Sequence, residues 1–286
     1  MTGKLFRAVL VAAALAPAAV ALALTAAPDL ADRAAGRRGA AFTPPGWYQP
    51  PAAGEWYLLG TDYLGRPFVP VLCSATAGTV RIALLGTALV VLGSLAVGVV
   101  HGSVRSAGLE GVIAAGNLGV MAVPEAAVLI TLATAWPRLA PAAWVNASMI
   151  AVLVAFAIPA AARLIADRVR AVGRAGFVAA SRGYGASPAY TFRHEVWPHL
   201  GEDVAWVVSS VLPRFVAVEV GLAYLGVEYR DFEGLGKLLA KCFSNLGVGT
   251  AVVQLLAVIA AVLWVALLPQ VVLRALGVRV LREGAA

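Results

Sequence analysis

Residues 82–100 read IALLGTALVVLGSLAVGVV and contain no charged side chain. A helix needs about 20 mostly apolar residues to cross the hydrocarbon core of a bilayer, which is about 30 Å thick. Backbone N–H and C=O groups cannot stay unpaired in lipid, so such a run must be helical. Its apolar residues are continuous rather than alternating, which argues against a strand of an outer-membrane barrel. The stretch therefore predicts a membrane-spanning α-helix.

The composition of the whole chain agrees with this prediction. Of 286 residues, 61% are hydrophobic and only 13% are charged, whereas a soluble domain carries about 25% charged residues. So little charge excludes a soluble globular enzyme, a disordered chain and a disulfide scaffold. The net charge of +7 is explained by basic residues on the cytoplasmic side of a membrane protein, and we expect no nucleic acid partner.

The same criterion predicts six spans: residues 8–27, 82–100, 111–136, 139–162, 204–227 and about 250–273. The first run also has the features of a secretory signal peptide, because Lys4 and Arg7 precede it. It is longer than the core of about 7–15 residues that is usual for a signal. Pro28 would also hinder cleavage after the run. We therefore expect a retained helix.

These spans predict a chain of four parts: an N-terminal helix (1–28), an extracytoplasmic loop (29–78), a five-helix core (79–275) with a cytoplasmic loop (166–200), and a tail (276–286). Lys and Arg near helix ends are enriched on the cytoplasmic side of membrane proteins. In this chain they are more numerous on the inner segments if both termini are cytoplasmic. We expect that orientation.

Three ionisable residues fall inside the predicted spans: Glu125, Arg214 and Glu219. Such residues are costly in lipid and usually face the interior of a bundle. Arg214 and Glu219 lie about 140° apart around one helix, so they do not simply pair with each other. We predict a pair between Glu125 and Arg214 across two helices. The three residues either fix the register of the helices or line a pathway, and they are too few for a proton relay.

The cytoplasmic loop predicts a helix, a turn and a second helix. Residues 163–184 contain no proline, so the preceding helix can continue out of the membrane. Residues 183–185, Gly-Tyr-Gly, permit a turn, and Pro188 can open a short helix that ends before Pro198. Four residues share one face of the first helix: Phe177, Ala180, Ser181 and Tyr184. We call residues 174–198 the elbow. It is either an amphipathic segment resting on the bilayer or a docking site for a soluble partner.

The chain carries no arrangement typical of an enzyme site. His101, His194 and His199 are too far apart or on different segments to indicate a metal site, and Cys73 and Cys242 lack a CxxC spacing. We expect two unpaired thiols, with a disulfide on the outer side as the alternative. No phosphate-binding loop is present in the sequence. If ATP drives transport, another chain must hydrolyse it.

Residues 59–66, LGTDYLGR, resemble the L-G-T-D-x-x-G-R signature of the permease subunits of ABC importers for dipeptides, oligopeptides and nickel, in particular the C-type member of the permease pair. The resemblance marks a motif before the second predicted span: Gly60, Thr61, Asp62, Gly65 and Arg66. We expect changes at Asp62 or Arg66 to impair either contact with a binding protein or folding of the outer gate. Residues 219–226, EVGLAYLG, are similar to the E-A-S-L-S-F-L-G stretch of the same family.

The elbow resembles the E-A-A-x-x-x-G loop of that family, which inserts into a groove on the ATPase subunit. The resemblance marks these coupling residues: Phe177, Ala179, Ala180, Ser181, Gly183, Tyr184, Gly185 and Pro198. Ala179 replaces the leading Glu, and Ser181 replaces the second Ala. In addition, Arg193-His194 stands one residue earlier relative to Pro198 than in the usual R-H-x-x-P. The missing carboxylate puts one polar contact in doubt, whereas the small residues and the glycine turn keep the shape.

The resemblance implies an all-α integral membrane protein with the six-helix fold of a type I ABC importer permease, embedded in lipid of a bacterial cytoplasmic membrane. It implies a heterodimer with a second permease, two ATPase subunits that bind Mg-ATP on the cytoplasmic side, and an extracytoplasmic substrate-binding protein. The chain itself is then expected to be no enzyme and to hold no cofactor or metal. Small solutes, above all peptides or nickel chelates, would cross by alternating access.

Two other classes of protein stay open as alternatives. An ion-coupled secondary carrier would need inverted-repeat halves, which the sequence does not show. A degenerate, non-transporting membrane scaffold is consistent with the altered position Ala179.

Overall fold

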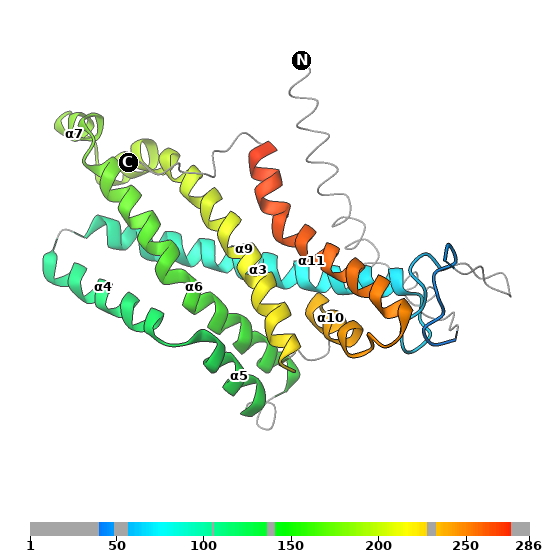
Figure 1. The fold of residues 1–286 in the computed structure, drawn as a ribbon. Helices are drawn as coiled ribbons and strands as arrows, with labels where there is room; N and C mark the ends of the chain where they lie inside the picture. The colour runs from blue at the N-terminus through cyan, green and yellow to red at the C-terminus, as the bar shows by residue number, and fades with distance from the viewer. Residues whose placement is uncertain (1–39, 49–56, 105, 136–140, 228–232, 276–286) are drawn as a thin grey trace, which may run out of the picture.

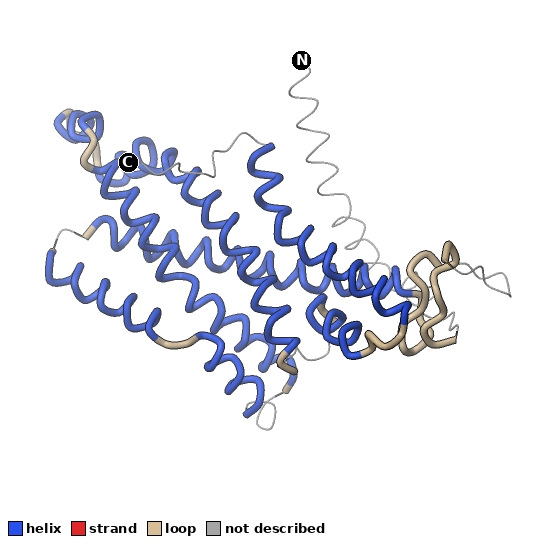
Figure 2. Tube along the Cα trace, viewed as in Figure 1, coloured by secondary structure: helices blue, strands red, loops and turns tan. Residues whose placement is uncertain are grey.

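The computed structural model describes residues 40–48, 57–104, 106–135, 141–227 and 233–275 (Figure 1). The first predicted span, residues 8–27, and the predicted tail, residues 276–286, lie outside the described residues. Within them the chain is helical and contains no strand, apart from an isolated bridge between Thr61 and Pro67. Figure 2 shows that the loops gather mainly at the two ends of the bundle. The predicted all-α class is therefore confirmed for this part of the chain.

The helices follow one another with short connections. In chain order they are α3 (Phe68–Ser103), α4 (Ala107–Ala122), α5 (Glu125–Ala135), α6 (Ala142–Gly173), α7 (Gly176–Gly183), α8 (Pro188–Thr191), the π-helix η2 (Phe192–Val196), the 3-10 helix η3 (Trp197–Leu200), α9 (Gly201–Tyr224), α10 (Leu235–Ser244) and α11 (Gly249–Ala275).

Four helical segments of the described residues are long and apolar enough to cross a membrane, and up to five if α4 and α5 are counted as one bent span. They are α3, α6, the continuous segment Pro188–Tyr224 and α11. The predicted spans 82–100, 204–227 and 250–273 fall on α3, α9 and α11. Together with the composition, these segments are those of a multi-pass membrane protein.

The second predicted span starts earlier than the sequence indicated. Helix α3 begins at Phe68, inside the segment 29–78 that we expected to be a loop. The charge-free run begins after Arg81, but one charge near a membrane interface does not end a helix. Phe68, Val71 and Ala75 are buried in the bundle, so packing extends the helix beyond the apolar run.

The third predicted span is broken rather than merely kinked. Helices α4 and α5 meet at an angle of 62° at Val123-Pro124. Pro124 has no backbone N–H and cannot continue the ladder of α4. Its carbonyl instead accepts from Ala127 and Val128 and opens α5. The acidic Glu125 stands in the first turn of α5, where the helix dipole favours a negative charge.

Close packing of α3 against α6 builds the centre of the bundle. A Cβ added to Gly98 would lie 2.7 Å from the Cβ of Ile165, and one added to Gly102 would lie 2.7 Å from the Cβ of Val169. Glycine at these positions lets two backbones approach, which is how helices associate where lipid removes the hydrophobic driving force. Gly102 lies at the end of α3, and Val169 lies near the end of α6, so the two helices stay in contact up to the point where the elbow begins.

Candidate functional site

The elbow is a helix–turn–helix at one end of the bundle (Figure 1). Helix α6 ends at Gly173, and α7 follows after a short break at Arg174-Ala175. Gly185 then turns the chain with φ +86°, a value that favours glycine. Ser187 caps the next helix, because its hydroxyl oxygen accepts from Tyr190 N at 3.2 Å. The turn and the helix start at Pro188 agree with the sequence prediction.

The apex of the elbow is exposed. Tyr184 is 94% exposed and Phe177 is 47% exposed, and Ala179 and Ala180 are exposed as well. Val178 is fully buried and fixes α7 to the rest of the chain. A large, almost fully exposed aromatic side chain, beside small residues that let a partner approach, is typical of a protein–protein contact.

The second helix of the elbow does not end before Pro198, contrary to the prediction. Instead, α8, η2, η3 and α9 form one continuous segment from Pro188 to Tyr224. Pro198 cannot donate to the carbonyl of His194. The preceding N–H, of Trp197, reaches back five residues to the carbonyl of Phe192 in a π-type bond. A π turn holds one more residue than an α turn, so it accommodates the extra residue between Arg193-His194 and Pro198.

Two sets of contacts fix the base of the elbow to the bundle. Val196 and Leu200 are buried against Ile165 and Val169 of α6. Arg168 of α6 donates through Nε to Oδ2 of Asp203 at 2.5 Å. Asp203 is almost fully buried near the start of α9. Helices α6 and α9 are thus tied together where the elbow joins them.

Residues 59–67, which we call the motif loop, lie at the opposite end of the bundle. Asp62 organises it: Oδ1 accepts from the backbone N–H of Leu64 at 2.9 Å and of Arg66 at 2.8 Å. Oδ2 accepts from Nε of Arg66 at 2.8 Å. Gly60 and Gly65 both have positive φ, +75° and +74°. The residue types of the motif are therefore those that this tight loop needs.

The motif loop is also fastened to α11 and to residues 40–48. Gln254 of α11 donates through Nε2 to the carbonyl of Thr61 at 2.8 Å. The Thr61 hydroxyl donates to the carbonyl of Ala40 at 2.7 Å and accepts from Thr43 N at 2.8 Å. Thr61 is fully buried and Asp62 is 3% exposed. The polar groups of both side chains already have hydrogen-bond partners within the chain. This favours a role in folding over direct contact with a binding protein.

A row of charges extends from the motif loop to α10. Arg66 lies 3.6 Å from Glu233, and Glu233 lies 2.8 Å from Lys241. Burial would raise the pKa of Glu233, but the hydrogen bond from Lys241 and the neighbouring positive charges hold it below its ordinary value. Burial would lower the pKa of Lys241, and the same pair raises it instead. Sequence reasoning missed Glu233 and Lys241, because nothing in their spacing marks them.

The predicted pair between Glu125 and Arg214 is confirmed. Nη2 of Arg214 on α9 bonds to Oε2 of Glu125 at the start of α5. The other carboxylate oxygen of Glu125 is buried without a hydrogen-bond partner among the described residues. The pair thus holds the broken span α4–α5 against α9 at the bend.

Glu219 is separate from this pair. Its carboxylate accepts from Oγ1 of Thr79 on α3 at 3.1 Å and from N of Gly236 in the first turn of α10 at 3.2 Å. The Thr79 hydroxyl oxygen also accepts from Leu235 N at 2.9 Å. Glu219 therefore braces three helices and caps the N-terminus of α10. The sequence singled out Glu219 but gave no sign of Thr79 or Gly236.

The two thiols are unpaired, as expected. Burial raises the pKa of Cys242 to about 11, so this thiol is unreactive. Among the described residues, no group of three or more His, Cys, Asp or Glu side chains could hold a metal ion.

Comparison with known proteins finds no family model that matches the chain. The chain is similar to two curated proteins, both the oligopeptide transport system permease protein OppC, from Lactococcus lactis subsp. lactis (strain IL1403) and subsp. cremoris (strain SK11). Each is 26% identical over 170 residues, which are 59% of this chain and 56% of the relative. The chain thus spans about half the length of the curated relatives that it matches. This distant similarity supports an ABC permease family and singles out no member.

Proposed function

We propose that this chain is a permease subunit of an ATP-driven importer, and that the elbow couples it to ATPase subunits on the cytoplasmic side. The observation that carries the proposal is the form of the elbow. It has an exposed apex, Ala180 and Tyr184, on a base that is buried and bonded to two membrane-spanning helices. The distant similarity to permease proteins supports the same function.

The contacts at the base of the elbow indicate how a movement would reach the membrane. A partner that displaces the apex would move α6 and α9 together, because Arg168 and Asp203 join them. Helix α9 carries Arg214 and Glu219, which are bonded to α5, α3 and α10. ATP binding can shift the inward–outward equilibrium only by its different affinity for the two states. The helical segment from Pro188 to Tyr224, which runs from the elbow into the bundle, would transmit that difference.

The chain would pair with a second, related permease, and an extracytoplasmic binding protein would deliver the solute. The cargo would be a peptide or another small solute, since the two similar proteins are named as oligopeptide permeases. Both termini would be cytoplasmic, in a bacterial cytoplasmic membrane. The permease itself would catalyse no reaction, and ATP with Mg²⁺ would bind to the ATPase subunits.

The substitution Ala180→Glu tests the proposal. Ala180 is exposed on α7, so the change leaves folding intact and places a charge where a partner would dock. Co-expression with candidate ATPase subunits should recover a complex for the natural chain and at least tenfold less for the variant. Ala171→Glu, at another exposed position near the end of α6, is the control and should leave the complex unchanged. Equal recovery of all three chains would contradict coupling through the elbow. A secondary carrier or a scaffold would recover no ATPase at all.

A further inference from the structure

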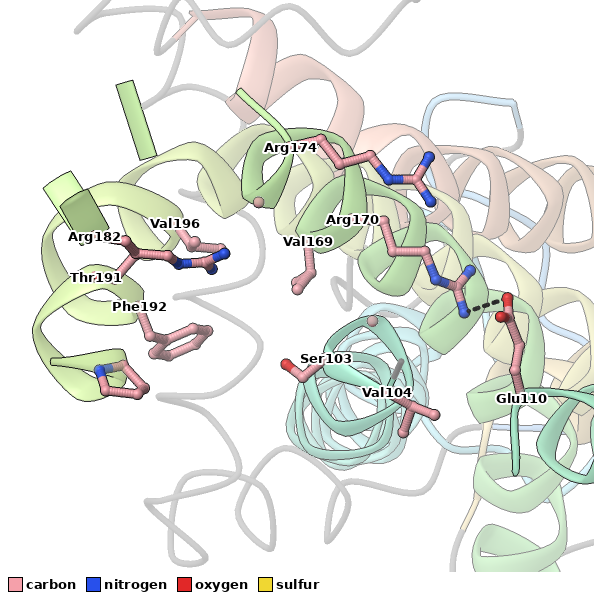
Figure 3. Close-up of a pocket in the computed structure, with 13 residues that line it drawn as sticks. Ser103, Val104, Glu110, Val169, Arg170, Arg174, Arg182, Thr191, Phe192 and Val196 are labelled. Atoms are coloured by element: carbon pink, nitrogen blue, oxygen red, sulfur yellow. Dashed lines mark ion pairs between the residues drawn. The ribbon is translucent and has the colours of Figure 1, made fainter. Parts of the chain in front are cut away.

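A hollow of about 610 Å³ lies between the elbow and the ends of α3 and α6 (Figure 3). Its walls come from the end of α3, the start of α4, the last turns of α6, Arg182 of α7, and α8 with η2. Its volume is within the range of about 300–1,000 Å³ that is usual for small-molecule sites. The hollow is thus built where the ends of α3 and α6 meet α4 and the elbow.

The charged side chains around the hollow are mostly positive. Three arginines and one glutamate line it: Arg170, Arg174, Arg182 and Glu110. Arg170 is already neutralised, since it lies 3.0 Å from Glu110 and 3.2 Å from Asp167. Arg174 and Arg182 have no side-chain hydrogen bond or ion pair with any described residue. The residues that line the hollow therefore carry an excess of two positive charges.

Figure 3 shows how these side chains lie. Arg182 points toward the space that separates Phe192 from Ser103 and Val169, whereas Arg174 lies above Arg170 with its guanidinium directed away from Arg182. Arg174 is exposed and free to turn. A guanidinium presents several N–H donors in one plane, which matches the oxygens of a phosphate.

A buried hydroxyl supplies an independent observation. Thr191 is 1% exposed, yet its Oγ1 has no hydrogen-bond partner within the described part of the chain. The same residue lines the hollow. A buried polar group without a partner costs free energy, and such groups in native proteins usually meet a ligand, an ion or a water. The unused hydroxyl points to a polar occupant.

We propose that the hollow binds a phosphate-type anion, held by Arg182, Arg174 and the hydroxyl of Thr191. Two sources carry this group: the head group of an anionic phospholipid and a free phosphate compound. The hollow lies at the ends of membrane-spanning helices, where basic pockets between helices bind anionic head groups. The placement of the hollow on the cytoplasmic side of the membrane rests on the proposed function, and the rest of the inference does not. The bound anion would join α8 and η2 to α6 and so stiffen the base of the elbow.

The experiment uses the full chain purified in detergent. Native mass spectrometry measures retention of phosphatidylglycerol against phosphatidylcholine, and thermal unfolding measures the shift caused by inorganic phosphate against chloride at equal ionic strength. Preferential retention of phosphatidylglycerol identifies a head group, and a shift by phosphate alone identifies a free anion. The absence of both effects, or equal retention of the two lipids without a phosphate shift, overturns the proposal. None of these readouts needs an ATPase, so failure here is distinct from failure of the proposed function.

Three variants locate the site. The double change Arg174→Gln and Arg182→Gln should weaken binding of the effective anion at least tenfold, since each removes a charge-assisted hydrogen bond. Arg193→Gln, also exposed on the elbow but outside the lining, should leave binding unchanged. Thr191→Val removes only the hydroxyl. It should weaken binding about threefold while the anion-free protein unfolds at the same or a higher temperature. If the Arg193 variant loses as much affinity as the double variant, the anion binds to general surface charge and the assignment is wrong.

Discussion

The motif loop and the elbow lie at opposite ends of the bundle, and both contain glycine at positive φ. In the motif loop the polar side chains are buried and bonded to the chain itself, as at Asp62. In the elbow the apex is exposed, and Tyr184 is 94% exposed. The polar side chains of the motif loop are bonded within the chain, whereas the side chains at the apex of the elbow are accessible to a partner. A sequence motif alone does not tell these two uses apart, but burial does.

Removal of the Asp62 carboxylate should produce the largest loss of stability. Asp62→Ala leaves the N–H groups of Leu64 and Arg66 without their acceptor and breaks a largely buried ion pair. We expect a loss of about 4 kcal/mol in the free energy of unfolding. Unfolding in detergent measures the loss, followed by the fluorescence of Trp47, whose indole N–H donates to the carbonyl of Leu58, the residue just before this loop. Unchanged stability with lost uptake would instead assign Asp62 to contact with another protein.

The two glycines at positive φ offer a matched comparison. A Cβ at Gly60 would lie 2.3 Å from the carbonyl oxygen of Thr43, whereas a Cβ at Gly185 would meet nothing within 4 Å. Gly185→Ala should therefore cost only the strain of the left-handed conformation, about 1 kcal/mol. Gly60→Ala adds a backbone collision and should cost about 3 kcal/mol. Unfolding of both variants in the same detergent checks the difference. Equal losses would mean that the motif loop can shift as freely as the elbow.

The sequence predicted the features that depend on local chemistry. Apolar runs located the spans that fall on α3, α6, α9 and α11, Pro124 located the break in the third span, and Gly185 located the turn of the elbow. The pair of Glu125 and Arg214 could be predicted because an unpaired charge in lipid is costly and ionisable residues there usually pair. These inferences need only nearby residues or a strong physical demand.

Features that depend on packing between distant parts of the chain could not be predicted from the sequence. Helix α3 extends back to Phe68 because residues there are buried against other helices, which no apolar run reveals. The π turn before Pro198 needs the three-dimensional path of the chain. Glu219 finds Thr79 and Gly236 far along the sequence. The hollow beside the elbow likewise exists only once the ends of α3 and α6 meet α4 and the elbow.

Acid should weaken the motif loop slightly. The pKa of Glu233 is held below its ordinary value of 4.5 by Lys241 and nearby positive charges. Its pairing therefore contributes stability above pH 4.5, and that stability is lost as the pH falls through the lower pKa of the folded protein. Because Glu233 is about one third exposed, the effect should stay below about 1 kcal/mol. Unfolding between pH 6 and about pH 3 should show a smaller loss for Glu233→Gln than for the natural chain. Identical pH profiles would remove Glu233 from the network.

The smallest effect on stability should occur at the apex of the elbow. Tyr184 is 94% exposed among the described residues, so Tyr184→Ala should change the free energy of unfolding by less than about 0.5 kcal/mol. If the apex docks into a partner, the same change should weaken the complex with ATPase subunits at least tenfold, since buried tyrosines are frequent hot spots. Exchange of Trp144, 69% exposed on α6, for alanine is the control, because it lies at the far end of that helix from the elbow. A protein whose stability falls with Tyr184→Ala would have an apex packed within the chain, and the contrast between the two ends of the bundle would disappear.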